Sequence, residues 1–363
     1  MLRLDRRLLQ NVDWPLLGAA FFIILLSLIS LSALAPGRGG SALAWRQLSW
    51  VGVGVLALLL VVSLDYRTLV RAAPALYVAG LGLLIAVLVL GRTVSGARRW
   101  IRLGAVTVQP SELFKLIFIL VLAWALASGR TQNLTRARLI GIFALLAVPV
   151  GLVVRQPDLG TALVLVPVAA AVMVGMGLRL KILGVLGLAG MAAMPLMWLV
   201  LRPYQRDRLL VYLDPFRDPL GTAYNVIQAK IAIGSGQLLG KGIAGATQSR
   251  LAFLPERHTD FIFAVFAEMW GFIGSLVLIV AYALLVMRGF EIAASTRDPR
   301  GRILALGVTA LFAAQTLINM GMVTGLLPIV GIPLPLMSYG GSSMVVSLMG
   351  LGLLLSIRMR QFH

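Results

Sequence analysis

Ten long apolar stretches dominate the pattern of hydrophobic and polar positions along this chain. Each is close to the roughly 20 residues that an α-helix needs to cross the hydrocarbon core of a bilayer. They cover residues of about 14–35, 45–64, 74–91, 112–128, 139–154, 160–178, 182–201, 259–287, 303–325 and 335–357. The pattern predicts an all-α, polytopic integral membrane protein with about ten transmembrane helices and one long outer loop at 202–258.

The composition excludes a water-soluble globular enzyme. Apolar residues make up 60% of the chain and charged residues only 12%, with a mean hydropathy of +0.95, whereas a soluble domain is about 25% charged. The net charge of +19 does not indicate nucleic acid as a partner, because the cations lie in short clusters between apolar runs. The lack of cysteine and the presence of only two histidines exclude disulfides and thiolate or histidine-rich metal sites.

The distribution of lysine and arginine predicts the orientation of the helices. With the N-terminus inside, 16 of the 32 basic residues fall in the inner segments, so we expect both termini to be cytoplasmic. The outer segment 92–111 carries four arginines against this bias. Either it is an ordinary exception to the rule, or these cations meet an anionic group outside the membrane, such as a lipid phosphate.

Ionisable residues near the outer helix ends are candidates for function, since such groups are costly at membrane depth unless they are paired or hydrated. Glu112 and Lys115 lie three residues apart on one helix face and are expected to form an ion pair, which could be purely structural. Gln109 lies just before the start of that helix. Asp158 lies between two spans, where it could cap the next helix, serve a site, or do both.

The long outer segment 202–258 leads into the densest polar cluster of the chain. Its glycine-rich part at 234–242 fits neither a P-loop nor a dinucleotide fingerprint, so we reject a nucleotide site. Residues 256–260 read Glu-Arg-His-Thr-Asp and open the eighth predicted span. Asp260 could be a helix cap or a site residue, and Glu268 lies deeper on the same helix.

The last outer loop, at 331–343, is rich in proline and glycine and predicts irregular backbone at a helix entrance. At membrane depth such backbone is tolerated only where it is buried in protein or lines a water-filled cavity. The polar motifs thus gather at the outer helix ends, and the sequence shows no comparable cluster at the inner ends.

Five segments together resemble the SEDS family (shape, elongation, division and sporulation). They are Arg98–Ile101, Gln109–Glu112, Gln156–Thr161, Leu254–Phe263 and Pro335–Ser343. The resemblance covers essentially the whole chain, in the same order and with ten spans, so a single domain spanning 1–363 is expected.

Two positions refine the resemblance. Arg257 makes the chain resemble the branch of the family that serves cell elongation, because division members typically carry alanine at this position. The family usually has a second acid next to the one at Glu268, but Met269 stands in its place here. A role for that second acid is therefore not available to this chain.

The resemblance implies a peptidoglycan glycosyltransferase in the bacterial cytoplasmic membrane, with its active site facing outward. It implies that lipid II and a lipid-linked nascent glycan are the substrates. It also implies a class B penicillin-binding protein transpeptidase and other elongation-complex membrane proteins as partners. The family's essential aspartate corresponds to Asp260. The expected substrate-binding or cavity residues are Arg46, Arg99, Gln109, Glu112, Lys115, Gln156, Asp158, Thr161, Glu256, Arg257, His258, Ser338 and Ser342.

Glycan chain growth requires one general base and positive charge near the leaving group. An α-linked donor that gives a β-1,4 product is displaced with inversion, and a single carboxylate such as Asp260 can take the proton of the acceptor 4-hydroxyl. The leaving pyrophosphate needs positive charge, from outer arginines or from a divalent cation, Mg²⁺ or Mn²⁺. Asp260 could bind such a metal through oxygen, but the sequence offers no complete ligand set.

The sequence also allows two other functions. A lipid II flippase, or another transporter of a lipid-linked substrate, would also carry buried charges such as Glu112 and Lys115. It would need a polar path to the inner face, which the sequence does not show. A non-catalytic scaffold for the penicillin-binding partner would keep all its function in an Asp260→Asn variant.

Overall fold

Long apolar helices make up most of the structure, a computed structural model. It describes residues 11–34, 38–94, 97–104, 106–127, 136–185, 203–214, 223–246 and 256–361, and a few isolated positions between 187 and 218. The helices are α2 (Trp14–Ala33), α3 (Arg38–Ser63), α4 (Tyr66–Leu90), α5 (Pro110–Ala127), α6 (Arg136–Arg155), α7 (Leu159–Gly175), α9 (Pro203–Leu213), α10 (Tyr224–Ser235), α11 (Gly242–Gly245), α13 (Ile262–Ser295), α14 (Pro299–Thr324) and α15 (Gly341–Met359).

Eight of the ten predicted membrane spans are confirmed as long apolar helices. Eight described helices are long and apolar enough to cross a membrane, and α7 is a ninth apolar helix of 17 residues. The predicted span at 182–201 lies largely outside the described residues. Several boundaries differ by six to eight residues. Helix α4 begins at Tyr66 rather than near residue 74, because Asp65 caps it and accepts a hydrogen bond from the Arg67 amide. Helix α13 continues to Ser295 rather than 287, and α15 begins at Gly341 rather than 335.

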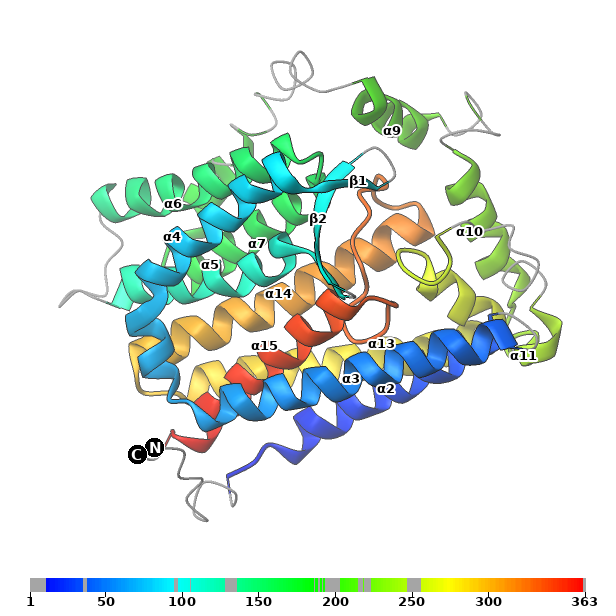
Figure 1. Cartoon of the computed structure of the whole chain (residues 1–363), viewed down its shortest axis with the longest axis horizontal. Helices are drawn as coiled ribbons and strands as arrows, with labels where there is room; N and C mark the ends of the chain where they lie inside the picture. The colour runs from blue at the N-terminus through cyan, green and yellow to red at the C-terminus, as the bar shows by residue number, and fades with distance from the viewer. Residues whose placement is uncertain are drawn as a thin grey trace.

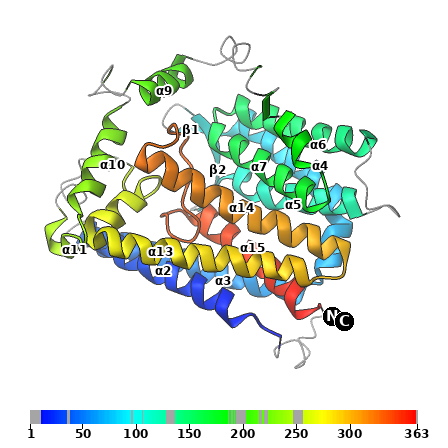
Figure 2. The ribbon, with the colours of Figure 1, turned by 180° about the vertical axis from the view of Figure 1, so that it is seen from behind.

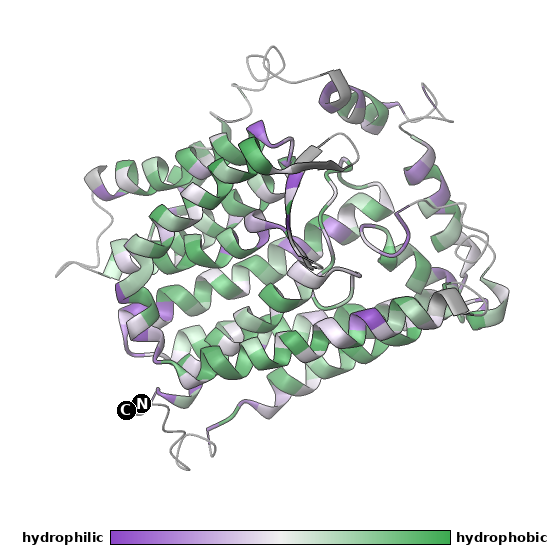
Figure 3. Cartoon of the chain, viewed as in Figure 1, coloured by the Kyte–Doolittle hydropathy of each residue, from purple (hydrophilic) through white to green (hydrophobic). Residues whose placement is uncertain are grey.

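The bundle is organised around α14, against which α5, α7 and α13 pack (Figures 1 and 2). Helix α15 packs along α3, and α2 packs along α13. Helices on the outside expose apolar side chains, such as Leu56, Val89 and Ile140, each about two-thirds exposed or more. Figure 3 shows hydrophobic positions along the helices and hydrophilic ones concentrated near helix ends and connections. Lipid would therefore solvate the exposed apolar faces.

A small antiparallel sheet lies between α4 and α5, within the predicted outer loop. Its strands are β1 (Arg92–Val94), β2 (Ala97–Leu103) and β3 (Val106–Val108), in the order β1-β2-β3. The hydrophobicity pattern did not predict these strands, because they are short and carry several arginines. The sheet contacts the ends of α4, α5 and α15 and so fixes the loop at one end of the bundle.

Helix α13 is broken at Gly271, whose φ of 67° lies in the left-handed region. The break frees backbone groups, which bond to the glycine-rich segment after α10: the amide of Phe272 donates to the Gln237 carbonyl at 2.8 Å. A Cβ at Gly271 would lie 2.3 Å from the amide nitrogen of Gly240. Only glycine therefore permits this close approach of the two backbones.

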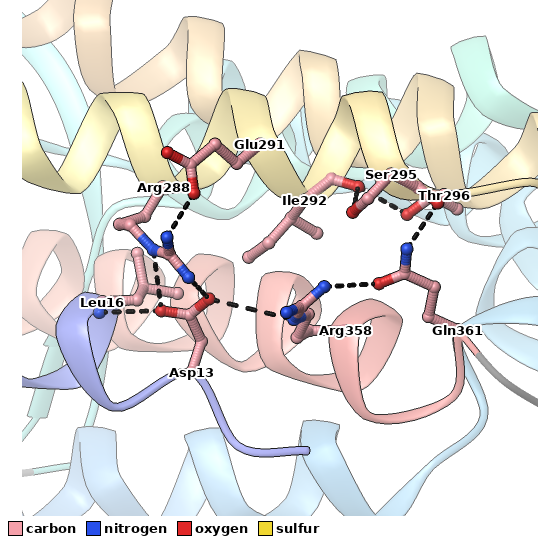
Figure 4. A network of polar contacts seen from close by, with 9 residues as sticks. All are labelled: Asp13, Leu16, Arg288, Glu291, Ile292, Ser295, Thr296, Arg358 and Gln361. Atoms are coloured by element: carbon pink, nitrogen blue, oxygen red, sulfur yellow. Dashed lines mark hydrogen bonds and ion pairs between the residues drawn. The ribbon is translucent and has the colours of Figure 1, made fainter.

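A polar network joins three helices where α2 begins and where α13 and α15 end, which we name the inner end of the bundle (Figure 4). Asp13 is buried there; it caps α2 and accepts hydrogen bonds from Arg288 at 2.7 and 3.2 Å. Arg358 lies 4.0 Å from the same carboxylate. The expectation that the inner helix ends lack a polar cluster is wrong, because these partners are separated by hundreds of positions in the sequence.

Candidate functional site

A cavity of about 310 Å³ opens among helix starts at the end of the bundle opposite this network, which we name the outer end. Helices α5, α7 and α15 all begin at its wall, and the turn at 256–261 that precedes α13 lies there too. The positive ends of several helix dipoles thus point toward one space, which favours an anionic ligand. The lining residues are Arg99, Trp100, Gln109, Glu112, Lys115, Asp158, Gly160, Thr161, Val164, Glu256, Thr259, Asp260, Gly331, Ile332, Pro333, Tyr339, Gly340, Ser342 and Ser343.

Asp158 is the centre of a buried hydrogen-bond network on one wall. As predicted, it caps α7: its Oδ1 accepts from the amide of Thr161 at 3.3 Å. Its Oδ2 accepts from the hydroxyls of Ser111 at 2.9 Å and Thr161 at 2.8 Å, and from the amide group of Gln109 at 3.2 Å. The carboxylate therefore joins the starts of α5 and α7, and its charge is satisfied by donors already in place.

Arg99 brings a cation from β2 to this wall. One of its guanidinium nitrogens lies 3.7 Å from Asp158 Oδ1, and another donates to the Pro157 carbonyl. Its Nε is buried and has no hydrogen-bond partner among the described residues. A buried donor without a partner costs free energy, so this nitrogen would be stabilised by a hydrogen-bond acceptor.

The expected ion pair on α5 is confirmed. Lys115 Nζ lies 2.7 Å from Glu112 Oε1, and both side chains are buried. Gln109, just before this helix, donates its backbone amide to the Ser342 hydroxyl of α15 at 3.1 Å. The starts of α5 and α15 are thereby held together on the cavity wall.

Asp260 also lines the cavity, partly exposed, from the turn before α13. Gly331 packs directly against it: a Cβ built at Gly331 would lie 3.2 Å from Asp260 Oδ2, and the φ of Gly331 is 69°. A larger residue at this position would be strained and would crowd the carboxylate.

Asn319 of α14 holds two parts of this wall and was not singled out by the sequence. Its fully buried side-chain amide donates to the backbone carbonyls of Asp260 at 2.9 Å and of Ile332 at 2.6 Å. A lone asparagine within an apolar span was the available signal, because an unpaired amide is costly there.

Several predicted site residues lie outside the cavity wall. Arg46 is exposed on α3, and Gln156 points away from the cavity, since its amide donates to the Leu84 carbonyl at 2.7 Å. Ser338 donates its hydroxyl to the Thr259 carbonyl at 2.6 Å and so fixes the turn that carries Asp260. These last two side chains support the architecture of the site rather than line it.

Arg257 and His258 are half-buried beside the cavity without lining it. Burial lowers the pKa of both side chains, and for His258 the neighbouring Arg257 adds to this effect while Glu256 opposes it. The His258 ring packs edge-on against Tyr339, with ring centroids 5.6 Å apart. The lowered pKa favours the neutral form of the His258 ring.

Carboxylates reach the cavity from different elements and do not form a three-residue metal cluster within the described part of the chain. Glu256 and Asp260 lie on the same turn and both line the cavity. Magnesium commonly binds through one or two carboxylates, with water and substrate phosphates completing its shell. The oxygen donors present on this turn fit a cation held in that way.

Comparisons with known proteins identify relatives over nearly the full chain. The sequence profile of the FtsW/RodA/SpoVE family, described as cell cycle protein, matches residues 10–363. The peptidoglycan glycosyltransferase MrdB of Escherichia coli (strain K12) is 41% identical over 347 residues, which covers 94% of this chain and 93% of the relative. The stage V sporulation protein E of Bacillus subtilis (strain 168) is 38% identical over 321 residues, 86% of each chain.

Solved structures show the same fold. The rod shape determining protein RodA of Thermus thermophilus matches with a TM-score of 0.74 at 32% identity, covering 97% of this chain and 98% of that chain. A chain from a peptidoglycan synthase complex, described as coordinating polymerization and crosslinking, matches with a TM-score of 0.82 at 36% identity. It covers 97% of this chain and 99% of that chain. The chain therefore belongs to the FtsW/RodA/SpoVE family, in agreement with the predicted resemblance to SEDS proteins.

Proposed function

We propose that this protein polymerises lipid II into glycan strands in the outer-end cavity, with Asp260 as the general base. As a member of its family the chain is a peptidoglycan glycosyltransferase. The observation that supports the assignment of the site is the shared cavity, which Asp260, Arg99 and Lys115 all line.

The proposed glycosyl transfer needs a general base but no general acid. The acceptor 4-hydroxyl oxygen attacks the anomeric carbon of the donor sugar and gives its proton to the Asp260 carboxylate. The bond from that carbon to the pyrophosphate oxygen breaks, and the electron pair leaves with the lipid pyrophosphate. Asp260 then releases the proton to water. One carboxylate suffices because pyrophosphate is already a good leaving group, unlike the alcohol in glycoside hydrolysis, which uses two carboxyl groups.

Positive charge for the pyrophosphate comes from other residues and helix starts that line the same cavity. The unpartnered Nε of Arg99 and the converging starts of α5 and α7 can bind phosphate oxygens. A divalent cation held by the oxygens of Glu256 and Asp260 would add charge to the same leaving group. Lys115 is bound to Glu112, so its net contribution is smaller. The Glu112–Lys115 pair and Asp158 hold the acceptor path in shape.

We place the protein in the bacterial cytoplasmic membrane, with the outer-end cavity facing away from the cytoplasm, where lipid II is polymerised. The matching chain from a complex that coordinates polymerization and crosslinking supports a partnership with a class B penicillin-binding protein transpeptidase. Other membrane proteins of the elongation machinery are the remaining proposed partners.

The experiment that tests this function separates polymerisation from transport. The purified chain is reconstituted in vesicles with lipid II and Mg²⁺, alone and with the transpeptidase, and both glycan strands and lipid II translocation are measured. We expect strands from the native chain and almost none from Asp260→Asn at equal protein level. Translocation without strands would support a flippase, and full function of Asp260→Asn would support a scaffold. Among the described residues, the outer-end cavity shares no lining residue with the cavities at the inner end, which argues against a continuous transport path.

A further inference from the structure

Two polar cavities lie at the inner end of the bundle, remote from the proposed active site. One, of about 470 Å³, lies among the end of α13, the start of α4 and the residues after α15. The other, of about 450 Å³, lies between the end of α7 and the start of α14. They share the lining residues Thr296 and Arg297 and so adjoin each other; we name the two together the inner basic pocket.

Cations dominate the lining of the inner basic pocket. Four arginines (Arg67, Arg297, Arg302 and Arg360) face a single lining carboxylate, that of Asp298. Asp298 is already occupied, because it pairs with Arg67 at 3.2 Å and accepts the Tyr66 hydroxyl at 2.9 Å. The positive charge that remains has no counterpart in the pocket.

Two of these arginines are available to a ligand. Arg297 is exposed and has no hydrogen bond or ion pair with any described residue. Arg302 is also exposed, and its one hydrogen bond within the described residues goes to the Gly175 carbonyl at 3.3 Å. Neither guanidinium is neutralised by a carboxylate within the described part of the chain.

Arg360 adds a charge that the protein itself holds out of water. Its guanidinium donates to neutral groups only, the Val62 carbonyl at 2.9 Å and the Ser356 hydroxyl at 2.6 Å, and burial lowers its pKa. It forms no ion pair among the described residues. Asp65 attracts this cation from beyond ion-pair distance and opposes the effect of burial on its pKa. A partly buried cation without an ion pair is stabilised when an anion enters beside it.

The wall of the pocket is fixed before any ligand arrives. Thr296 donates its hydroxyl to the Ile292 carbonyl at 2.6 Å, and the Gln361 amide donates to the Ser295 carbonyl (Figure 4). An ordered wall costs little further entropy on binding. Leu64, two residues before the lining residue Tyr66, is partly exposed and offers an apolar surface to an acyl chain.

We propose that the inner basic pocket binds the phosphate of an anionic phospholipid from the inner leaflet. The helix ends around it are the level at which lipid headgroups lie, and basic pockets between transmembrane helices suit such headgroups. This site is independent of glycosyl transfer, because it lies at the other end of the bundle from Asp260.

Thermal unfolding of the purified chain in detergent tests the proposal. Short-chain phosphatidylglycerol, short-chain phosphatidylcholine and inorganic phosphate are titrated separately. We expect phosphatidylglycerol to raise the unfolding midpoint far more than the other two, since a ligand that binds only the folded state stabilises it. The double variant Arg297→Gln/Arg302→Gln should bind phosphatidylglycerol at least about tenfold more weakly, because each basic residue near the surface contributes about fivefold.

A matched double variant controls for surface charge. Arg71→Gln/Lys181→Gln removes the same charge from exposed side chains near the same end that do not line the pocket. It should keep the native affinity. Equal loss in both double variants, or no loss in Arg297→Gln/Arg302→Gln, would overturn the site. If inorganic phosphate shifted the unfolding midpoint as much as phosphatidylglycerol does, the claim that the bound phosphate belongs to a lipid would be wrong. Because no lipid II is present, the outcome does not depend on the proposed function.

Discussion

At the scale of single residues, Asn319 has a larger influence on the proposed active site than its position in an apolar helix indicates. One amide group binds the carbonyl of Asp260 and that of Ile332, so it sets the distance between the turn before α13 and the loop at 331–333. Catalytic groups must be held within fractions of an ångström of their productive position. Asn319 is therefore a positioning residue for Asp260.

Replacing Asn319 by leucine should lower kcat at least about tenfold with little change in KM, because two buried carbonyls lose their donor and the turn relaxes. The control is Thr316→Val on the same helix, since the Thr316 hydroxyl is buried without a partner in the described structure. Polymerisation rates measured well below the unfolding midpoint check the prediction. A folded Asn319→Leu variant with native kcat would contradict it.

His258 predicts a dependence of stability on pH. Its pKa in the folded chain lies below the 6.5 of the unfolded chain, so the unfolded state takes up the proton first as the pH falls. The free energy of unfolding should therefore decrease as the pH falls below about 6.5. The variant His258→Phe keeps a ring beside Tyr339 and should show a smaller decrease between pH 7 and pH 5, as measured by thermal unfolding. Identical pH profiles of stability for the native chain and His258→Phe would show that His258 does not cause the pH dependence.

Residue spacing predicted some contacts of the site and could not predict others. The pair Glu112–Lys115 and the capping role of Asp158 depend on positions three apart, so the sequence was sufficient for both. The bonds of Asp158 to Ser111 and Arg99 join segments about 50 residues apart. Such contacts depend on how helices pack, which no local pattern records.

At the scale of the elements, α13 shows how tertiary contacts override the hydrophobic pattern. The apolar run continues through Gly271, so the sequence predicts one unbroken helix there. The break is stable only because the carbonyls of Gln237 and Leu238 accept the amides of Phe272 and Ile273. Those acceptors belong to the glycine-rich segment for which the sequence offered no role.

The inner polar network should be a major source of stability between elements. Asp13→Ala should lower the free energy of unfolding by about 2 to 4 kcal/mol, because it removes the cap of α2 and leaves Arg288 without its buried partner. The matched variant Glu291→Gln removes the exposed partner of the same arginine and should cost less than about 1 kcal/mol. Unfolding in detergent measures the free energy of both variants. Equal losses of stability would contradict the expectation that Asp13→Ala is the more destabilising change.

At the scale of the whole molecule, hydropathy predicted nearly all of the described spans, since a bilayer dictates their length and composition. The structure adds that the polar groups divide into two separate sets, one at each end of the bundle. Sequence clusters showed only the outer set, because its residues lie together in short motifs. The inner set assembles from helix ends that are distant in sequence.

The predicted sidedness can be measured because the chain has no cysteine of its own. A single cysteine replacing Leu239, which is 78% exposed near the outer end, should react with a membrane-impermeant maleimide added to intact spheroplasts. A single cysteine replacing the exposed Ala294 at the inner end should react only after the membrane is opened. The reverse pattern would place the outer-end cavity in the cytoplasm and exclude the proposed function.

The most direct test of the central claim is the single-turnover rate of glycosidic bond formation by Asp260→Asn at saturating lipid II. Removing a general base should slow this step by about 10² to 10⁴-fold, whereas lipid II affinity should stay within about threefold because the asparagine keeps the shape of the side chain. A rate within tenfold of the native chain would show that Asp260 is not the base.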